Sequence, residues 1–283
     1  MNVTNSMLLL NTIGAGKVGQ VLARLLRQHQ VWMPSQICNR SISSAQAAVD
    51  FIGAGQVVAD RVQMDASDIW MLSVPDDQIV SAGDALTGKL NAHSIVFHCS
   101  GAKPSTILQS AIRAGAAVAS VHPVRSFADV QQSAEQFAGT ICSVEGDARA
   151  LAVLIPALQA IGAKTVQISA ESKLLYHAGS VFASNYLVSL IDIALHAYQA
   201  AGIPEDIALA MAAPLARQSL ENALTMGTAR ALTGPIARGD MDTVHQQQRT
   251  VAQWNADAGD VYAAMMPPTI ALAARKAALD SAG

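Results

Sequence analysis

The feature that most constrains this chain is a glycine-rich turn close to its start. A short apolar run at residues 7–10 leads into the sequence Ile-Gly-Ala-Gly-Lys-Val-Gly at residues 13–19, and a helix-like apolar pattern follows at residues 21–26. The spacing is G-x-G-x-x-G between a strand and a helix, which is the arrangement that binds a dinucleotide. The alternative interpretation is a glycine turn that only packs a helix against a sheet.

Each glycine of this turn has a separate task in a dinucleotide site. Gly14 permits the tight turn out of the strand, Gly16 keeps the space for a diphosphate free of side chain, and Gly19 lets the helix pack closely on the sheet. The helix N-terminus offers free N–H groups and the positive end of its dipole to the phosphates. The residues predicted to bind the cofactor here are Gly14, Ala15, Gly16, Lys17, Val18 and Gly19.

Composition narrows the class of protein. The chain has 283 residues, of which 51% are apolar and 14% charged, and its net charge is −3, so it has no basic surface for nucleic acid. Three cysteines without metal-ligand spacing predict reduced thiols in a cytoplasmic protein without a metal site. No signal peptide is evident at the start.

An uncharged stretch between Lys173 and Asp192 is nearly long enough to span a bilayer, but its many polar side chains favour a buried helix over a membrane span.

The pattern along the chain predicts two domains. Strand-like runs near residues 7–10, 36–40, 56–58, 68–74, 94–99, 117–121, 140–144 and 164–168 are separated by helical patterns. This alternation predicts an α/β Rossmann domain, a doubly wound and mostly parallel sheet, over residues 1–168. Residues 169–283 read as an all-α domain that begins with one continuous helix over residues 171–200 and continues with helices at 205–226, 241–253 and 258–280.

The end of the second strand indicates which nicotinamide cofactor binds. An acidic residue at this place commonly holds the ribose diol of NAD, but the chain has Asn39, Arg40 and Ser41. Arg40 can neutralise a 2′-phosphate and Ser41 can donate a hydrogen bond to it, so these residues favour NADP over NAD. The alternatives are a solvated arginine and a serine that only caps the next helix.

Further candidate residues follow the later strands, because ligands of open α/β sheets lie beyond the carboxyl ends of the strands. Val74 and Pro75 would form an apolar wall beside the cofactor, and Ser100 would bind a nicotinamide amide or a substrate oxygen. His122 would bind the substrate or exchange a proton with it, whereas His98, inside a strand, fits a core histidine. The residues assigned here are Val74, Pro75, Asp76, Ser100 and Gly101 for the cofactor and His122 for catalysis.

The start of the long helix carries a polar stripe. Lys173 and His177 are four residues apart and therefore share a helix face, and Asn185 lies further along. A lysine or histidine that faces the cleft between the predicted domains can protonate the atom that gains negative charge when a hydride arrives. The alternative is a solvated first turn. Lys173, His177 and Asn185 join His122 as the predicted catalytic residues.

These motifs together resemble one known superfamily. The chain is similar to the 6-phosphogluconate dehydrogenase-like and β-hydroxyacid dehydrogenase superfamily, which includes pyrroline-5-carboxylate reductase, ketopantoate reductase and prephenate dehydrogenase. More closely it resembles the branch that joins a Rossmann-like domain to a DUF2520 domain. The motifs that carry the resemblance are at residues 14–19, 73–77, 98–102, 120–123, 173–178, 183–185 and 232–240.

The resemblance implies further properties and one departure. The superfamily often has Lys-x-x-x-Asn on its catalytic helix, but here the fourth residue after Lys173 is His177, so a 3-hydroxyacid substrate does not follow. Members commonly dimerise through the helical domain, which implies a homodimer in which Arg238 would meet a substrate carboxylate across the interface. The alternative for Arg238 is a surface arginine after a turn.

The sequence thus predicts an NADP-dependent oxidoreductase that acts on a small carbonyl or imine substrate bearing a carboxylate. Two alternatives remain open at this point. One is an imine reductase of the pyrroline carboxylate type, and the other is a non-catalytic NADP-binding module that senses redox state.

Overall fold

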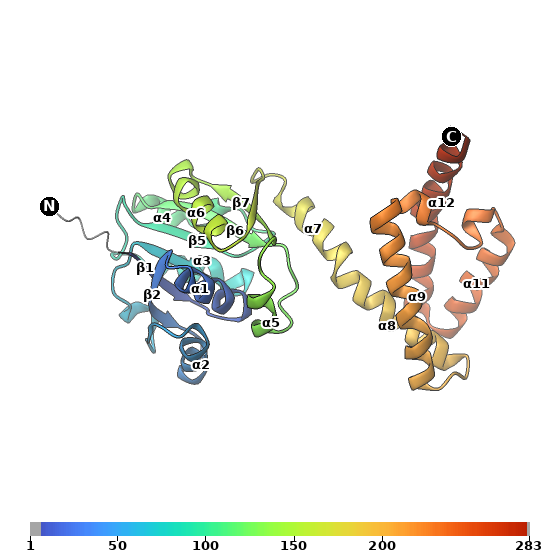
Figure 1. The fold of residues 1–283 in the computed structure, drawn as a ribbon, viewed down its shortest axis with the longest axis horizontal. Helices are drawn as coiled ribbons and strands as arrows, with labels where there is room; N and C mark the ends of the chain where they lie inside the picture. Colours follow the sequence, from blue (N-terminus) through green and yellow to red (C-terminus); the bar gives the residue numbers. More distant parts are fainter. Residues whose placement is uncertain (1–6, 282–283) are drawn as a thin grey trace. The chain divides into compact units, whose positions relative to one another are not determined.

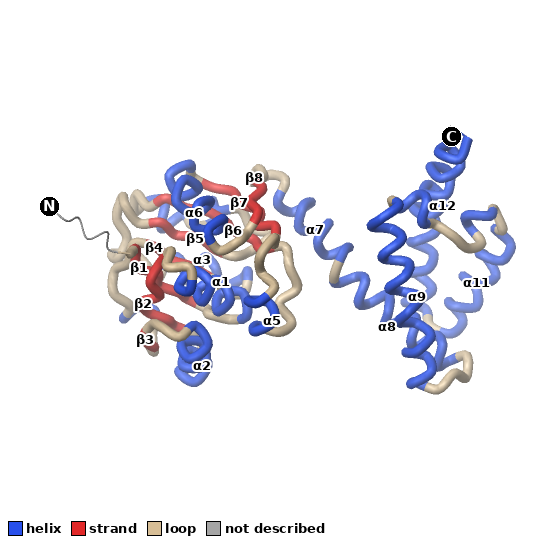
Figure 2. The backbone as a smooth tube through the Cα atoms, viewed as in Figure 1, coloured by secondary structure: helices blue, strands red, loops and turns tan. Residues whose placement is uncertain are grey.

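Eight strands form a single sheet in the first part of the chain (Figures 1 and 2). The computed structural model describes residues 7–281. The order across the sheet is β3-β2-β1-β4-β5-β6-β7-β8, and every neighbouring pair is parallel except β6 and β7. The strands are β1 (Leu8–Ile13), β2 (Trp32–Cys38), β3 (Gln56–Val57), β4 (Ile69–Leu72), β5 (Ile95–His98), β6 (Ala117–Pro123), β7 (Ile141–Gly146) and β8 (Lys164–Gln167). The predicted doubly wound, mostly parallel sheet is confirmed, and the carboxyl ends of β1, β4, β5 and β6 share one edge.

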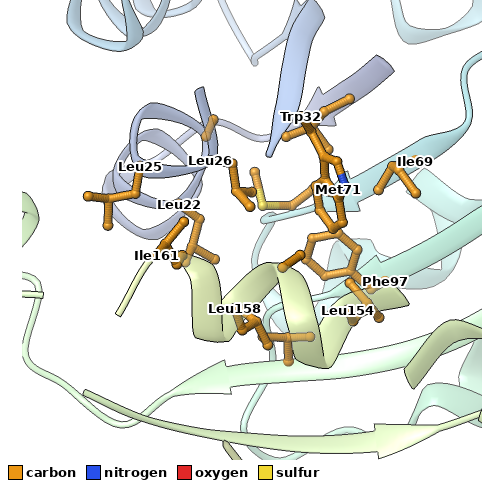
Figure 3. Close-up of a cluster of buried hydrophobic side chains, with 14 of the residues drawn as sticks. Leu22, Leu25, Leu26, Trp32, Ile69, Met71, Phe97, Leu154, Leu158 and Ile161 are labelled. Atoms are coloured by element: carbon orange, nitrogen blue, oxygen red, sulfur yellow. The ribbon is translucent and has the colours of Figure 1, made fainter. Parts of the chain in front are cut away.

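Helices cover both faces of this sheet. One face packs against α1 (Lys17–Gln28), α2 (Ile42–Ile52), α5 (Val130–Glu135) and α6 (Ala148–Ala160), and the other against α3 (Ile79–Asp84) and α4 (Gln109–Arg113). Figure 3 shows the core of the first face, where Leu22 and Leu26 of α1 meet Met71 and Phe97 of the sheet. Each large apolar side chain buried in this way contributes roughly 1.5–3 kcal/mol. This packing holds the N-terminus of α1 in place over the edge of the sheet.

The described chain after β8 is helical, as predicted. Its helices are α7 (Lys173–Ala183), α8 (Asn185–Ala200), α9 (Glu205–Met226), α10 (Thr228–Ala231), α11 (Met241–Trp254) and α12 (Ala256–Ser281), with a 3-10 turn at Ile236–Arg238. The predicted continuous helix over residues 171–200 is wrong in one respect. Ser184 leaves the helical conformation, with φ −127° and ψ −71°, and separates α7 from α8. Serine competes for backbone hydrogen bonds and is a weak helix former, so it suits such a break.

The chain divides into two compact units, Met1–Phe182 and Ala183–Gly283. Helix α7 therefore belongs with the sheet, whereas the sequence pattern alone placed the boundary at 168/169, where strands give way to helices. Because Lys173 and His177 lie on α7, they are part of the unit that carries the glycine turn.

Many apolar side chains remain exposed on the helices of the chain. Helix α8 has no buried residue, and the run Lys173–Ala200 is the one described segment long and apolar enough to cross a membrane by length and composition. Ser184 breaks this run, and Ser180, Asn185 and Ser189 add polar groups that lipid disfavours.

Candidate functional site

The three glycines of the turn differ in what surrounds them. Gly14 has φ +80°, and a Cβ there would lie 2.8 Å from the Ser73 carbonyl oxygen and collide with Val74. A Cβ on Gly19 would lie 3.0 Å from the Cβ of Ser73, which reflects the close approach of α1 to the end of β4. Gly16 is different, because a Cβ there would meet no atom within 4 Å. The fold thus needs Gly14 and Gly19, whereas Gly16 borders open space.

The N-terminus of α1 is prepared for an anion. Gly16 is its N-cap, and no side chain caps the helix, so the first N–H groups have no intrahelical partner. The neighbouring Ala15 N–H donates to Oδ1 of Asn39 at 2.6 Å, and Nδ2 of Asn39 donates to the Ser44 carbonyl at 2.9 Å. Asn39, just after β2, therefore stabilises the turn through these hydrogen bonds. The charge and the geometry of this turn fit a diphosphate.

A cavity of about 590 Å³ lies beside the glycine turn. Arg40 lines this cavity, and so does Arg61 of the 3-10 turn Arg61–Gln63. The predicted cofactor residues that line it are Gly14, Ala15, Gly16, Asn39, Arg40, Val74 and Pro75. Both guanidinium groups suit a phosphate on the adenosine ribose, so the residues present fit NADP.

Several predicted cofactor residues have other roles. Ser41 is the N-cap of α2, its hydroxyl accepting from the Ser44 N–H at 3.2 Å, and it is not among the residues that line the cavity. The amine of Lys17 donates to the Ala128 carbonyl at 2.7 Å. Val18, Gly19 and Asp76 are also outside the lining. For Ser41 the alternative of a helix cap therefore describes the structure.

Sequence reasoning missed part of this cavity. The lining also includes Gln20, Ser44, Ala59, Asp60, Arg61, Ser73 and Gln78. Asp60 and Arg61 follow the short strand β3, so the rule that ligands gather at carboxyl ends of strands would have found them.

A group of polar residues lies at the ends of β5 and β6, the strands that follow β4 across the sheet. Ser100 is buried, and its hydroxyl accepts the N–H groups of Ala102 and Lys103 at 3.2 and 3.0 Å, so it stabilises a turn. His98 is a buried core histidine, as expected: its Nδ1 accepts from the Ser100 N–H, and its Nε2 lies 3.3 Å from the Pro104 carbonyl. Burial lowers the pKa of His98 to about 4.

Lys173 is buried rather than open to solvent. It is 1% exposed, and its Nζ donates to the Ser120 hydroxyl at 2.7 Å and to the Ser100 carbonyl at 3.1 Å. Among the described residues no carboxylate lies within ion-pair distance of it, and burial lowers the pKa of its ammonium. The alternative of a solvated first turn does not describe Lys173. The lysine ties α7 to the ends of β5 and β6.

Three half-buried side chains meet just beyond Lys173; we refer to His122, Tyr176 and His177 as the His122 cluster. The Nδ1 of His122 lies 2.9 Å from the hydroxyl of Tyr176, and the two rings are perpendicular. The ring centroids of His122 and His177 are 5.6 Å apart. Burial first, and then the neighbouring His177 and Lys173, lowers the pKa of His122 to about 4.

Gly101 closes one side of the His122 cluster. A Cβ on Gly101 would lie 2.9 Å from Nε2 of His122 and would collide with the ring of His177. The structure thus brings together the predicted residues Lys173, His177, His122, Ser100 and Gly101. Tyr176 was missed, because its partner His122 is 54 residues away. Asn185 begins α8 and belongs to the second unit.

Two protein-family models match the chain. A Rossmann-like domain covers residues 1–123, and the domain of unknown function DUF2520 covers residues 140–268. The second model begins at β7, so it includes the last two strands of the sheet. The chain therefore belongs to the proteins that join a Rossmann-like domain to a DUF2520 domain, the branch that its sequence resembles.

Solved structures share this fold over nearly the whole chain. Protein TM1727 from Thermotoga maritima is 25% identical, with a TM-score of 0.74 over 94% of this chain and 99% of that one. A putative NADP oxidoreductase, BF3122 from Bacteroides fragilis, is 16% identical, with a TM-score of 0.77 over 93% and 98%. An imine reductase from Myxococcus stipitatus in complex with NADP⁺ is 15% identical, with a TM-score of 0.65 over 92% of each chain. Among curated proteins, none matches this sequence.

Proposed function

We propose that this protein is an NADP-dependent oxidoreductase that transfers a hydride between the nicotinamide and a small carbonyl or imine substrate bearing a carboxylate. The observation that carries the proposal is the cavity beside the glycine turn. It combines open space at Gly16, an uncapped helix N-terminus and the guanidinium of Arg40. The oxidoreductases among the similar folds support the same class of cofactor.

The order of the strands indicates where each half of the cofactor would lie. The adenosine half would occupy the cavity at the ends of β1, β2 and β4, with its 2′-phosphate on Arg40. Strands β5 and β6 follow β4 across the sheet, one and two spacings away, or about 5 and 10 Å. The nicotinamide would therefore lie toward Gly101 and the His122 cluster.

The cofactor, when bound, supplies the hydride. The amides at Gly16 would hold the diphosphate, and Val74 and Pro75 form part of the cavity wall. At the other end, His122 would hold a proton for the substrate atom that gains charge, with His177 beside it. Lys173 adds a buried positive charge behind these groups, which favours an anionic product in this region.

The two alternatives differ from this proposal in what turnover they predict. An imine reductase of the pyrroline carboxylate type would act on cyclic imines, whereas a redox sensor would bind NADPH without oxidising it. Loss of the reduced nicotinamide absorbance, measured with a panel of keto acids, semialdehydes and cyclic imines, separates them. Turnover of a keto acid or semialdehyde supports the carbonyl reductase, and turnover of cyclic imines alone supports the imine reductase. Tight NADPH binding with no turnover across the panel would leave only the sensor.

We also propose that the protein is a cytoplasmic homodimer whose helical part is covered by a second copy. Val188 on α8 is 69% exposed and Leu224 on α9 is 74% exposed, because no other described element of the second unit covers them. Exposed apolar side chains in such number are typical of an interface between subunits. The acidic net charge gives no support to nucleic acid as a partner.

A further inference from the structure

We infer that the Tyr176 hydroxyl fixes His122 in the tautomer that carries its proton on Nε2, so that His122 can deliver this proton to a substrate beside Gly101. In this assignment Tyr176 is a positioning residue that acts through His122. The inference deepens the proposed function, because it specifies the proton donor of the same site.

The first observation is the geometry of the pair. The Tyr176 oxygen and Nδ1 of His122 are 2.9 Å apart, a normal hydrogen-bond distance, and the rings meet edge to face at 87°. The two residues come from α7 and β6, so the bond joins elements that are distant in sequence. Such a bond fixes the rotation of the imidazole ring about its Cβ–Cγ bond.

Two parallel contacts hold α7 against β6 and position this bond. Ser120 and His122 are two residues apart on β6 and therefore point to the same face of the sheet. Lys173 and Tyr176 are three residues apart on α7 and share a helix face. Lys173 contacts Ser120 at 2.7 Å, and Tyr176 contacts His122 at 2.9 Å. The buried lysine thus anchors the helix so that the tyrosine reaches the histidine.

The protonation states decide which atom donates. A neutral imidazole has one donor nitrogen and one acceptor nitrogen. Burial lowers the pKa of His122 to about 4 and raises that of Tyr176, so at neutral pH the pair is an imidazole and a phenol. The phenolic O–H is a far stronger acid than the N–H of a neutral imidazole, so O–H···Nδ1 is the better bond. This leaves the proton of His122 on Nε2.

The second ring nitrogen of His122 is available for a substrate. Among the described residues, Nε2 has no hydrogen-bond partner, and it is not one of the buried unpaired atoms. A Cβ on residue 101 would lie 2.9 Å from Nε2, so glycine is what lets the imidazole pack against the backbone here. His177 presents the edge of its ring at the same place. Asp76 and Lys173 exert opposite electrostatic effects on the His122 ring. A substrate oxygen or nitrogen beside Gly101 would meet one N–H donor.

The electrons and protons of the step balance with the reduced nicotinamide and water as the only co-reactants. The hydride of the reduced nicotinamide adds to the carbonyl or imine carbon, and the two electrons of the C=O or C=N π bond move onto the oxygen or nitrogen. That atom takes the proton of Nε2, while Nδ1 takes the proton of the Tyr176 hydroxyl. To restore the starting state, Nδ1 returns this proton to the phenolate and Nε2 takes a new proton from water.

Nitrogen NMR of the full-length protein tests the assignment without a known substrate. In protein labelled with ¹⁵N-histidine and mixed with NADP⁺, we expect His122 to carry its proton on Nε2, with the Nδ1 resonance displaced by a hydrogen bond. The variant His122→Gln assigns the signals. In Tyr176→Phe, which keeps the ring, Nδ1 should move toward the value of an unbonded imidazole, and the Nε2–H population should fall.

A matched control removes a different phenol. Tyr262 donates to Oε1 of Gln247 in the second unit, so Tyr262→Phe should leave the His122 signals unchanged. A proton on Nδ1 in the wild-type protein would overturn the inference, as would an Nδ1 resonance that Tyr176→Phe does not move. Absence of any spectral response to NADP⁺ would count against the proposed function instead, and the tautomer would still be read from the free protein.

Discussion

Replacing Gly16 by alanine separates the cofactor site from the fold. A Cβ at this position meets no atom within 4 Å, and the backbone, with φ −75° and ψ −161°, is accessible to any residue. Alanine lowers the entropy of the unfolded chain, which stabilises by about 0.4–1 kcal/mol, but it is a poorer N-cap than glycine by a similar amount. The free energy of unfolding should therefore stay within about 1 kcal/mol of the wild-type value.

Binding of NADPH should respond very differently. The new methyl group occupies the space where the diphosphate approaches the backbone amides, so at least one charge-assisted hydrogen bond is lost. Such a bond contributes about 1.5–3 kcal/mol, which corresponds to a roughly 10- to 100-fold weaker Kd. Urea unfolding and titration calorimetry with NADPH measure the two quantities on the same preparation.

Gly179 offers a matched control for this substitution. It lies on α7, its Cβ would also meet open space, and alanine in a helix is favourable by about 1 kcal/mol. Gly179→Ala should bind NADPH as the wild type does. If Gly16→Ala also binds NADPH with unchanged affinity, the diphosphate does not lie on this turn and the reasoning fails.

Three more predictions concern the fold and the assembly. Gly14→Ala should lower the free energy of unfolding by at least about 1–3 kcal/mol in urea, because of the positive φ and the collision with Val74; wild-type stability would contradict this. His98 has a pKa of about 4 in the fold and about 6.5 when unfolded, so the unfolded chain binds more protons and stability falls as pH drops from 6.5 to 4. Its contribution is a loss of about 2 kcal/mol at pH 5 relative to pH 7.5; an equally steep pH dependence in His98→Gln would argue against it. If the proposed homodimer forms through this face, light scattering should show a dimer for the wild type and a monomer for Val188→Glu; an unchanged mass in the variant would contradict an interface at Val188.

The sheet could be predicted largely from sequence. Each of the eight strand-like runs corresponds to a strand. The signal is clearest for β4 and β5, which are fully buried parallel strands and leave short, mainly apolar runs between polar turns. The start of β2 at Trp32 was missed, since Pro34 within it reads as a strand breaker. The antiparallel pairing of β6 with β7 depends on contacts across the sheet and leaves no local signal.

The site could be predicted only in part, for reasons that particular residues illustrate. The glycine spacing identified the turn, because Gly14 adopts a positive φ and Gly19 allows the close approach of α1 to β4. The spacing grouped Lys173 with His177 on one helix. The burial of the Lys173 ammonium could not be predicted in this way, because it depends on Ser100 and Ser120, more than 50 residues away. Helical spacing from Lys173 selected His177 and passed over Tyr176, whose partner lies on β6.

The measurement that tests the central claim most directly is calorimetric titration of the full-length protein with NADPH and NADH, repeated for Arg40→Gln. A charge-assisted contact of Arg40 with the 2′-phosphate contributes about 1.5–3 kcal/mol, so NADPH should bind roughly 10- to 100-fold more tightly than NADH. In Arg40→Gln this preference should largely disappear, while NADH affinity stays the same. Absence of measurable heat with either nucleotide, or equal affinity for both in the wild-type protein, would contradict the assignment.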